Sequence, residues 1–195
     1  CGRGAAGAGE TRGFCEALTA QGVRVRQRVV FVGEMRVGLI GQVRRRWTAR
    51  GVKWCQRVER SYEWRHLQVA VDPLSGAVWQ RWSARLGKEA AVAALSEWRA
   101  LGLAVMVWEN AGSHRACAVR EVGVALVYLP AYWSELTSVV GVLCAVGRCV
   151  ADVVDGLLAA KLAAVAGALG RLRDGMVRLV GWDWIREALA GLPCD

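Results

Sequence analysis

Apolar residues along this chain fall into short runs whose length and composition are typical of buried strands. Three runs rich in Val and Leu predict such strands at 28–33, 103–108 and 124–129. Two more, 66–71 and 77–82, flank the turn Asp72-Pro73-Leu74-Ser75-Gly76. An early Pro and a late Gly in so short a turn predict a β-hairpin, which is the clearest local element of the sequence.

Other segments carry apolar residues at the spacing of an amphipathic helix. The segment 88–101 places five apolar side chains on one helical face, at Ala91, Ala94, Leu95, Trp98 and Leu101. Further on, Ser113 is a suitable N-cap for a helix that runs to about Val122. The remainder, 135–192, is helical in pattern, with breaks predicted near Gly170 and Gly181.

The order of these elements is strand, hairpin, helix, strand, helix, strand and then helices. A meander followed by strand-helix units predicts an α/β protein with a mixed sheet and helices packed on it. Element order by itself does not single out one fold of this class.

The composition of the chain indicates what kind of partner it could bind. The chain has 195 residues, of which 54% are hydrophobic and 22% charged, which suits one domain with a sizeable core. Its net charge is +9, supplied almost entirely by Arg, and this favours a polyanionic partner. The alternative, a GC-rich genome that encodes Arg in place of Lys, stays open.

The sequence argues against a disulfide framework, a zinc site, a membrane span and a secretory signal. Seven cysteines without a CxxC pair argue against a disulfide framework and a zinc site. The most apolar stretch, 136–147, is too short to span a bilayer, and no secretory signal is visible. We therefore expect a cytoplasmic protein with no membrane partner and no small-molecule substrate. Because the chain starts at Cys1, we also expect a fragment or a product that lacks its natural start.

Three segments carry distinctive motifs, and their order and intervals matter: 30–36 (VFVGEMR), 105–114 (VMVWENAGSH) and 128–140 (YLPAYWSELTSVV). Together they resemble the three catalytic motifs of DDE-type transposases of the mariner-like bacterial insertion-sequence superfamily. In that family the first strand ends in an aspartate-glutamate pair. The second motif has aspartate-asparagine-alanine and a histidine. The third has tyrosine-leucine-proline-proline-tyrosine, then serine-proline-glutamate-leucine-asparagine-proline and, two residues further on, the catalytic glutamate.

This resemblance covers roughly 11–192 and implies a ribonuclease-H-like mixed sheet flanked by helices, with a helical C-terminal tail. It implies a Gly/Ala/Arg-rich lead-in with a short helix at 1–26, a DDE catalytic domain at 27–150 and a helical extension at 151–195. The family uses Mg²⁺ or Mn²⁺ to cut DNA and join the freed 3′-hydroxyl to a new phosphodiester. The partners implied are transposon ends, target DNA and a second copy in a homodimer, in a bacterial cytoplasm and associated with the nucleoid.

The family's three acids map onto Gly33, Glu109 and Val140, of which only Glu109 is acidic and could bind a metal. Mg²⁺ needs oxygen ligands that converge from separate parts of the fold, and one carboxylate cannot hold two ions. Two other acids lie near these positions, Glu34 and Glu135. Either could substitute for a lost acid, but adjacent strand residues point to opposite faces, which disfavours replacement of Gly33 by Glu34. We interpret both acids as structural and the chain as a degenerate, catalytically impaired copy.

Basic residues of the Trp-containing stretch 41–53, predicted as loops and a short strand, are candidate phosphate contacts: Arg44, Arg45, Arg46, Arg50 and Lys53. A solvated charged loop is the alternative for this stretch. His114 stands at the family's histidine position and joins the nucleic-acid-binding candidates. No upstream helix-turn-helix is evident, so recognition of transposon ends is not assigned.

Three functional hypotheses follow. The first is an impaired transposase catalytic domain, whose enzyme activity is uncertain. The second is a non-catalytic DNA-binding or dimerising remnant, and the third is a decayed reading frame without a stable fold.

Overall fold

A single mixed sheet forms the centre of the protein in a computed structural model that describes residues 8–40, 47–53, 55, 57, 59–129 and 137–194. Its five strands have the order β3-β2-β1-β4-β5. They are β1 (Val29–Gly38), β2 (Trp64–Val71), β3 (Val78–Ser83), β4 (Val105–Trp108) and β5 (Ala125–Tyr128). The first three strands form an antiparallel meander, and β4 and β5 add to β1 in parallel. The α/β mixed sheet expected from the sequence is confirmed.

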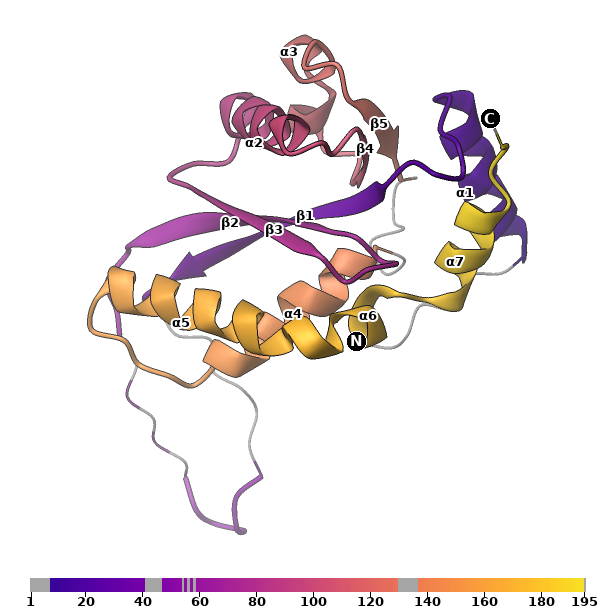
Figure 1. Ribbon diagram of the computed structural model, residues 1–195. Coiled ribbons are helices and arrows are strands. Elements are labelled where there is room, and N and C mark those ends of the chain that lie inside the picture. The colour runs from indigo at the N-terminus through magenta and orange to yellow at the C-terminus, as the bar shows by residue number, and fades with distance from the viewer. Residues whose placement is uncertain are drawn as a thin grey trace.

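Helices cover both faces of this sheet (Figure 1). One face carries α2 (Lys88–Ala100), the 3-10 turn η1 (Gly112–Arg115) and α3 (Cys117–Arg120). The other face carries α4 (Ser138–Val150), α5 (Leu158–Leu172), the 3-10 turn η3 (Arg173–Gly175) and α6 (Met176–Val180). At one end of the sheet, α1 (Ala8–Ala20) packs against α7 (Asp183–Ala190). The result is a three-layer arrangement with a helix pair at its edge.

The strands supply two separate cores because successive side chains point to opposite faces. On the α4 side the buried strand residues include Val29, Phe31, Leu67, Val69, Val71, Val105 and Val107. On the α2 side they contribute Val30, Val32, Ala70, Met106, Trp108 and Leu126. Residues of β1 therefore alternate between the two helical layers.

The hairpin between β2 and β3 forms as its turn residues predict. The Asp72 amide donates to the Ala77 carbonyl, and the Gly76 amide donates to the Asp72 carbonyl, both at 2.9 Å. The Asp72 carboxylate accepts from the Leu74 amide and the Ser75 hydroxyl, which closes the turn from inside. Gly76 has φ +71°, a conformation that favours glycine.

Residues near the two ends of the chain share the α4-side core. Phe14 of α1 lies 5.4 Å from Trp184 of α7 and 5.8 Å from Phe31 of β1, measured between ring centroids. The Val25 amide also donates to the Pro193 carbonyl at 3.2 Å. The division at 26/27 and 150/151 stays a prediction, but these contacts pack both flanking segments against the sheet.

Two local predictions were wrong, each for a physical reason. The strand at 28–33 continues to Gly38, because antiparallel pairing with β2 extends to Gly38↔Trp64. Ser113 does not cap one helix to Val122, since it lies inside η1, and the extended backbone of Ala116 separates η1 from α3. The short strand expected within 41–53 stays a prediction, because 47–53 contains a turn and no strand while 41–46 lies outside the described residues.

The helical C-terminal part is interrupted at a place that its sequence pattern did not predict. Between α4 and α5 the chain forms a polar loop, in which Asp152 has φ +63°. The Lys161 ammonium organises this loop by donating to the Val150 and Val153 carbonyls at 3.0 Å, beside the Asp155 carboxylate. The break at Gly181 is confirmed, whereas Gly170 lies within α5 and the break follows at η3. Among the described residues no helix is both long and apolar enough to cross a membrane.

Candidate site beside the end of β4

Two of the three mapped acid positions lie side by side where β1 and β4 run in parallel. The register pairs Phe31 with Val107, and Gly33 and Glu109 each follow two residues later. Glu109 is the first residue after β4 and is exposed. β4 ends at Trp108, whereas β1 continues past Gly33 to Gly38, so the two positions lie where the parallel pairing of β1 with β4 stops.

The third mapped position, Val140, lies in the first turn of α4 and is half-buried. The preceding residue, Val139, packs on Gly33. A Cβ at Gly33 would lie 2.6 Å from Cγ1 of Val139 and 3.3 Å from Cδ1 of Leu143. The structure thus places Gly33 beside the first turn of α4, which carries Val140, and apolar side chains occupy the space beside Gly33.

Gly141 marks a second close approach of α4. A Cβ there would lie 3.1 Å from the Leu179 carbonyl oxygen of α6. That oxygen belongs to the backbone, so a longer side chain at 141 would need α4 or α6 to shift. Gly33 and Gly141 therefore hold α4 close to β1 on one side and to α6 on the other.

Glu34 points away from this apolar contact, as strand alternation predicts. Its side chain is 11% exposed and lies on the α2 side of the sheet. The Gln68 side-chain amide donates to Oε1 of Glu34 at 2.9 Å, directly across the β1–β2 pairing. Oε2 of Glu34 lies 3.6 Å from Nε2 of His114.

His114 is buried at the centre of this polar cluster, with 2% of its surface exposed. Its ring stacks on Trp108 at 3.9 Å between centroids, and Nδ1 lies 3.2 Å from the Glu109 carbonyl oxygen. Burial by itself lowers the pKa of His114, but its interactions with Glu34 and the Glu109 carbonyl, and the charges of both carboxylates, outweigh burial and raise it. The ring is turned inward, so its predicted contact with nucleic acid stays a prediction.

Sequence reasoning missed two members of the cluster. Gln68 is fully buried, and only the β1–β2 register reveals that it faces Glu34. The Tyr128 hydroxyl donates to the His114 carbonyl at 2.6 Å. Burial raises the pKa of Tyr128, while nearby Arg120 and Arg115 lower it. No motif marks Gln68, whereas Tyr128 opens the third family motif.

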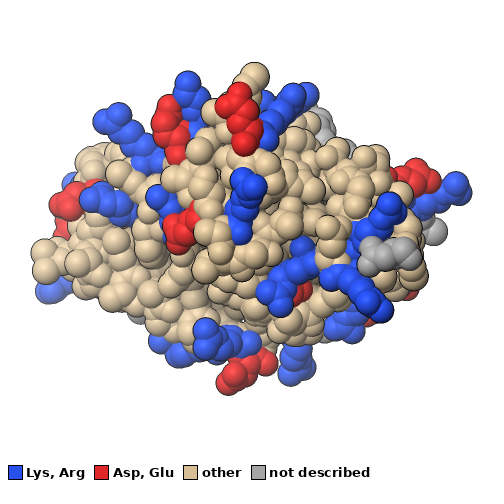
Figure 2. All heavy atoms as spheres, turned by 45° about the horizontal axis from the view of Figure 1, so that its top comes forward, with Lys and Arg blue, Asp and Glu red and all other residues tan. Residues whose placement is uncertain are grey.

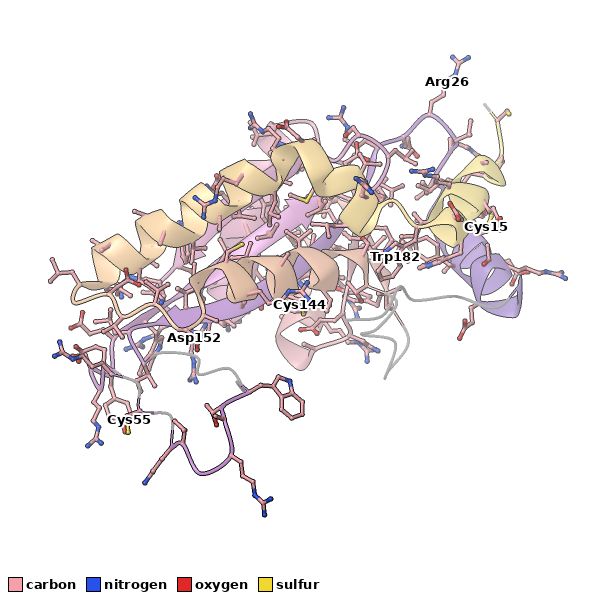
Figure 3. The ribbon with its side chains drawn as sticks, turned by 90° about the horizontal axis from the view of Figure 1, so that it is seen from below. Cys15, Arg26, Cys55, Cys144, Asp152 and Trp182 are labelled. Carbon is pink, nitrogen blue, oxygen red and sulfur yellow. The ribbon has the colours of Figure 1, made fainter. Side chains whose placement is uncertain are left out.

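The structure describes two of the five residues predicted to contact phosphate. Arg50 and Lys53 are exposed, on a loop between β1 and β2 that extends away from the sheet (Figure 1). Cys55 lies on the same projecting segment (Figure 3). Arg44, Arg45 and Arg46 lie outside the described residues. On the face that carries α2 and α3, Lys and Arg side chains are widely spread and interspersed with fewer acidic ones (Figure 2).

Among the residues that the structure describes, which do not include Glu135, the donor set does not fit a pair of Mg²⁺ or Mn²⁺ ions. Such a pair needs several carboxylates converging on one point. Of the three mapped positions only Glu109 offers one, and Glu34 is directed to the opposite face of β1. Within the described ranges, no group of three or more His, Cys, Asp or Glu residues is arranged to hold a metal ion.

Comparison with solved structures identifies the fold. The chain is similar to the Mos1 mariner transposase in its paired-end complex with Mn, with TM-score 0.64 and 15% identity over 95% of this chain and 64% of that one. It is similar to the Mos1 strand transfer complex, with TM-score 0.66 and 16% identity over 93% and 60%. The chain has the ribonuclease-H-like fold of these transposases.

The match extends over nearly all of this chain but less than two thirds of the first two transposase chains. A third structure, the Mos1 paired-end complex with Mg, matches with TM-score 0.60 and 16% identity over 100% of this chain and 66% of that one. No family sequence model and no curated protein matches the chain. Below 25% identity these likenesses establish the fold, and the activity has to be argued from the residues.

Proposed function

We propose that this chain is the catalytic domain of a mariner-like insertion-sequence transposase whose metal-dependent DNA cleavage and strand transfer are impaired. The fold and the three motifs in family order support the transposase assignment. The observation that carries the impairment is the packing of Val139 against Gly33, where the family has a carboxylate.

The chemistry explains why this contact matters. In a two-metal reaction one ion activates the nucleophile and the other stabilises the leaving oxygen. Glu109 alone cannot hold both ions, and its carboxylate is one methylene further from the backbone than that of aspartate. Catalytic groups must be placed to within about half an ångström, so the remaining acid does not rebuild the site.

A nicking and strand-transfer assay on plasmid DNA with Mg²⁺ or Mn²⁺ tests this proposal. We expect no product above the level of the Glu109→Ala variant, which removes the last acid. Robust metal-dependent cleavage that Glu109→Ala abolishes would overturn the impairment. Terminal inverted repeats and an upstream helix-turn-helix frame in the flanking DNA would support the insertion-sequence origin.

The alternative function is a non-catalytic DNA-binding or dimerising remnant. The exposed basic loop favours it, because Arg50 and Lys53 stand clear of the sheet and are accessible to a phosphate backbone. Transposon ends and target DNA are the partners we propose, in a bacterial nucleoid, with Arg44, Arg45 and Arg46 in the same basic stretch. His114 would contribute to DNA binding from its buried position in the fold.

Salt-dependent DNA binding tests this alternative. Removing one phosphate-binding side chain should reduce the slope of log affinity against log salt by about one, so Arg50→Ala with Lys53→Ala should reduce it by about two. Lys88→Ala, which removes an exposed lysine on α2, serves as the control and should leave the slope almost unchanged.

Sedimentation of the chain with and without DNA tests the homodimer. Absence of a cooperative thermal transition would instead favour a decayed reading frame.

A further inference from the structure

We propose that His114 is a positioning residue that, with Glu34 and Gln68, fixes the backbone of Glu109. This inference rests on the proposed function only in treating Glu109 as the second acid position. The contacts that carry it lie on the α2 side of β1, away from Gly33 and Val140.

The contacts form a continuous path from the middle of the sheet to the acid position. Gln68 on β2 donates to Glu34 on β1 at 2.9 Å, and Glu34 lies 3.6 Å from Nε2 of His114. Nδ1 of the same ring lies 3.2 Å from the Glu109 carbonyl oxygen. Each ring nitrogen of His114 thus faces an oxygen, one from the sheet and one from the acid-bearing segment.

Glu109 needs such an anchor because it lies beyond the strand ladder. The pairing of β4 with β5 ends at Trp108↔Tyr128, where the Leu129 amide donates to the Trp108 carbonyl at 3.0 Å. A backbone carbonyl past the end of a ladder must find a donor elsewhere or remain solvated. The His114 ring reaches back five residues to the Glu109 carbonyl and takes the place of a strand neighbour.

The ring itself is held in place on several sides. It stacks on the fully buried Trp108 with 22° between the ring planes. Its backbone is fixed as well, because the His114 amide donates to the Ala111 carbonyl at 3.0 Å and its carbonyl accepts from the Tyr128 hydroxyl. A buried side chain fixed by stacking and hydrogen bonds has little rotamer freedom, and this precision passes to the backbone atom that it contacts.

The arrangement explains why a polar cluster persists where two acids are absent. Its members point to the α2 side, so the glycine and valine at the other two acid positions leave their contacts untouched. The cluster therefore fixes where residue 109 lies, independently of whether metal ions are held.

Amide hydrogen exchange of the full chain, followed by NMR, tests the role of each ring nitrogen. An Asn side-chain amide can replace the Nδ1 side of histidine, whereas a Gln amide reaches toward the Nε2 side. We expect His114→Ala to speed exchange at 110–115 by about tenfold or more, the loss of one charge-assisted hydrogen bond. His114→Asn should restore most of the protection, and His114→Gln should restore less.

The other histidine provides the matched control, because His66→Ala should leave exchange at 110–115 unchanged. If His114→Ala does not fold, the Asn and Gln variants carry the test, and equal exchange at 110–115 in these two overturns the proposal. Wild-type protection in a folded His114→Ala variant overturns it as well. The exchange experiment uses neither DNA nor metal. A negative result therefore counts against the His114 contact alone, and the proposed function is tested separately by the cleavage and binding assays.

Discussion

Two neighbouring residues of β1, Gly33 and Glu34, face opposite layers of the protein and have opposite surroundings. On the α4 side, Val139 and Leu143 pack over a glycine. On the α2 side, a carboxylate is held by Gln68 and His114 and is 11% exposed. Gly33, onto which the motif maps the family's first acid, lies on the apolar side, and the neighbouring Glu34 lies on the polar one.

This difference separates two roles that acids in the first motif can have, which are metal binding and support of the fold. A carboxylate that binds metal lies close to other acids, so its removal relieves repulsion among like charges and can leave the fold intact. A buried carboxylate with hydrogen-bond partners cannot be removed without leaving those partners unsatisfied. Under the proposed function, absence of the first carboxylate and presence of the second are what we expect of a domain that keeps its fold while its catalysis is impaired.

The strongest way to break this comparison is to remove the carboxylate on the polar side. Glu34→Ala leaves the Gln68 amide and the His114 ring without their partner, so we expect a loss of about 3 kcal/mol in the free energy of unfolding. Chemical denaturation measures it. Glu89→Ala, an exposed acid 3.9 Å from Lys88, is the control and should change stability by less than about 0.5 kcal/mol. A Glu34→Ala variant as stable as this control would show that the cluster does not support the fold.

The apolar side is probed by giving Gly33 a side chain. Gly33→Ala places a methyl group 2.6 Å from Val139 Cγ1, and such overpacking should cost about 2 kcal/mol. Gly170→Ala is the control, because nothing lies within 4 Å of its Cβ and alanine should stabilise α5 by up to about 1 kcal/mol.

A double variant shows whether Val139 causes the cost at Gly33. Val139→Ala removes the clashing methyl groups, so Gly33→Ala should cost less in that background than in the wild type. Equal costs in both backgrounds would place the strain elsewhere. The same contact indicates that Gly33→Asp alone would not rebuild an acid site, since Val139 occupies the space beside it.

How much of this could be predicted from the sequence depends on how local each feature is. The hairpin at Asp72–Gly76 and the helix at 88–101 depend on nearby residues, and the structure places both as expected. The extension of β1 to Gly38 and the partnership of Gln68 with Glu34 depend on register between distant segments. The three motifs indicated the acid positions, but the packing of α4 on Gly33 requires the folded chain.

Glu34 was interpreted as structural from strand alternation alone, and its contacts on the α2 side agree with that interpretation. His114 was associated with the site through its motif, but its burial was not predicted. A histidine two residues after a glycine in a short polar segment carries no sequence signal for packing against Trp108.

The smallest expected effect concerns His66, which lies on the same face of the sheet as Glu34. In register His66 pairs with Arg36 and Ser83, and its Nδ1 has no hydrogen-bond partner among the described residues. Burial lowers the pKa of His66, Glu34 raises it, and Arg36 lowers it, so the net shift is downward. The unfolded chain therefore binds a proton at His66 more readily than the folded one does.

The sign of the pH dependence follows from this difference. The stability associated with neutral His66 is fully present above its unfolded pKa of about 6.5, and it is lost as the pH falls below that value toward the lowered folded pKa. Denaturation curves from about pH 8 to about pH 5 should show a larger loss on acidification in the wild type than in His66→Gln. Parallel curves for the two proteins would mean that His66 titrates alike in the folded and unfolded chains, and that burial produces no net lowering of its pKa.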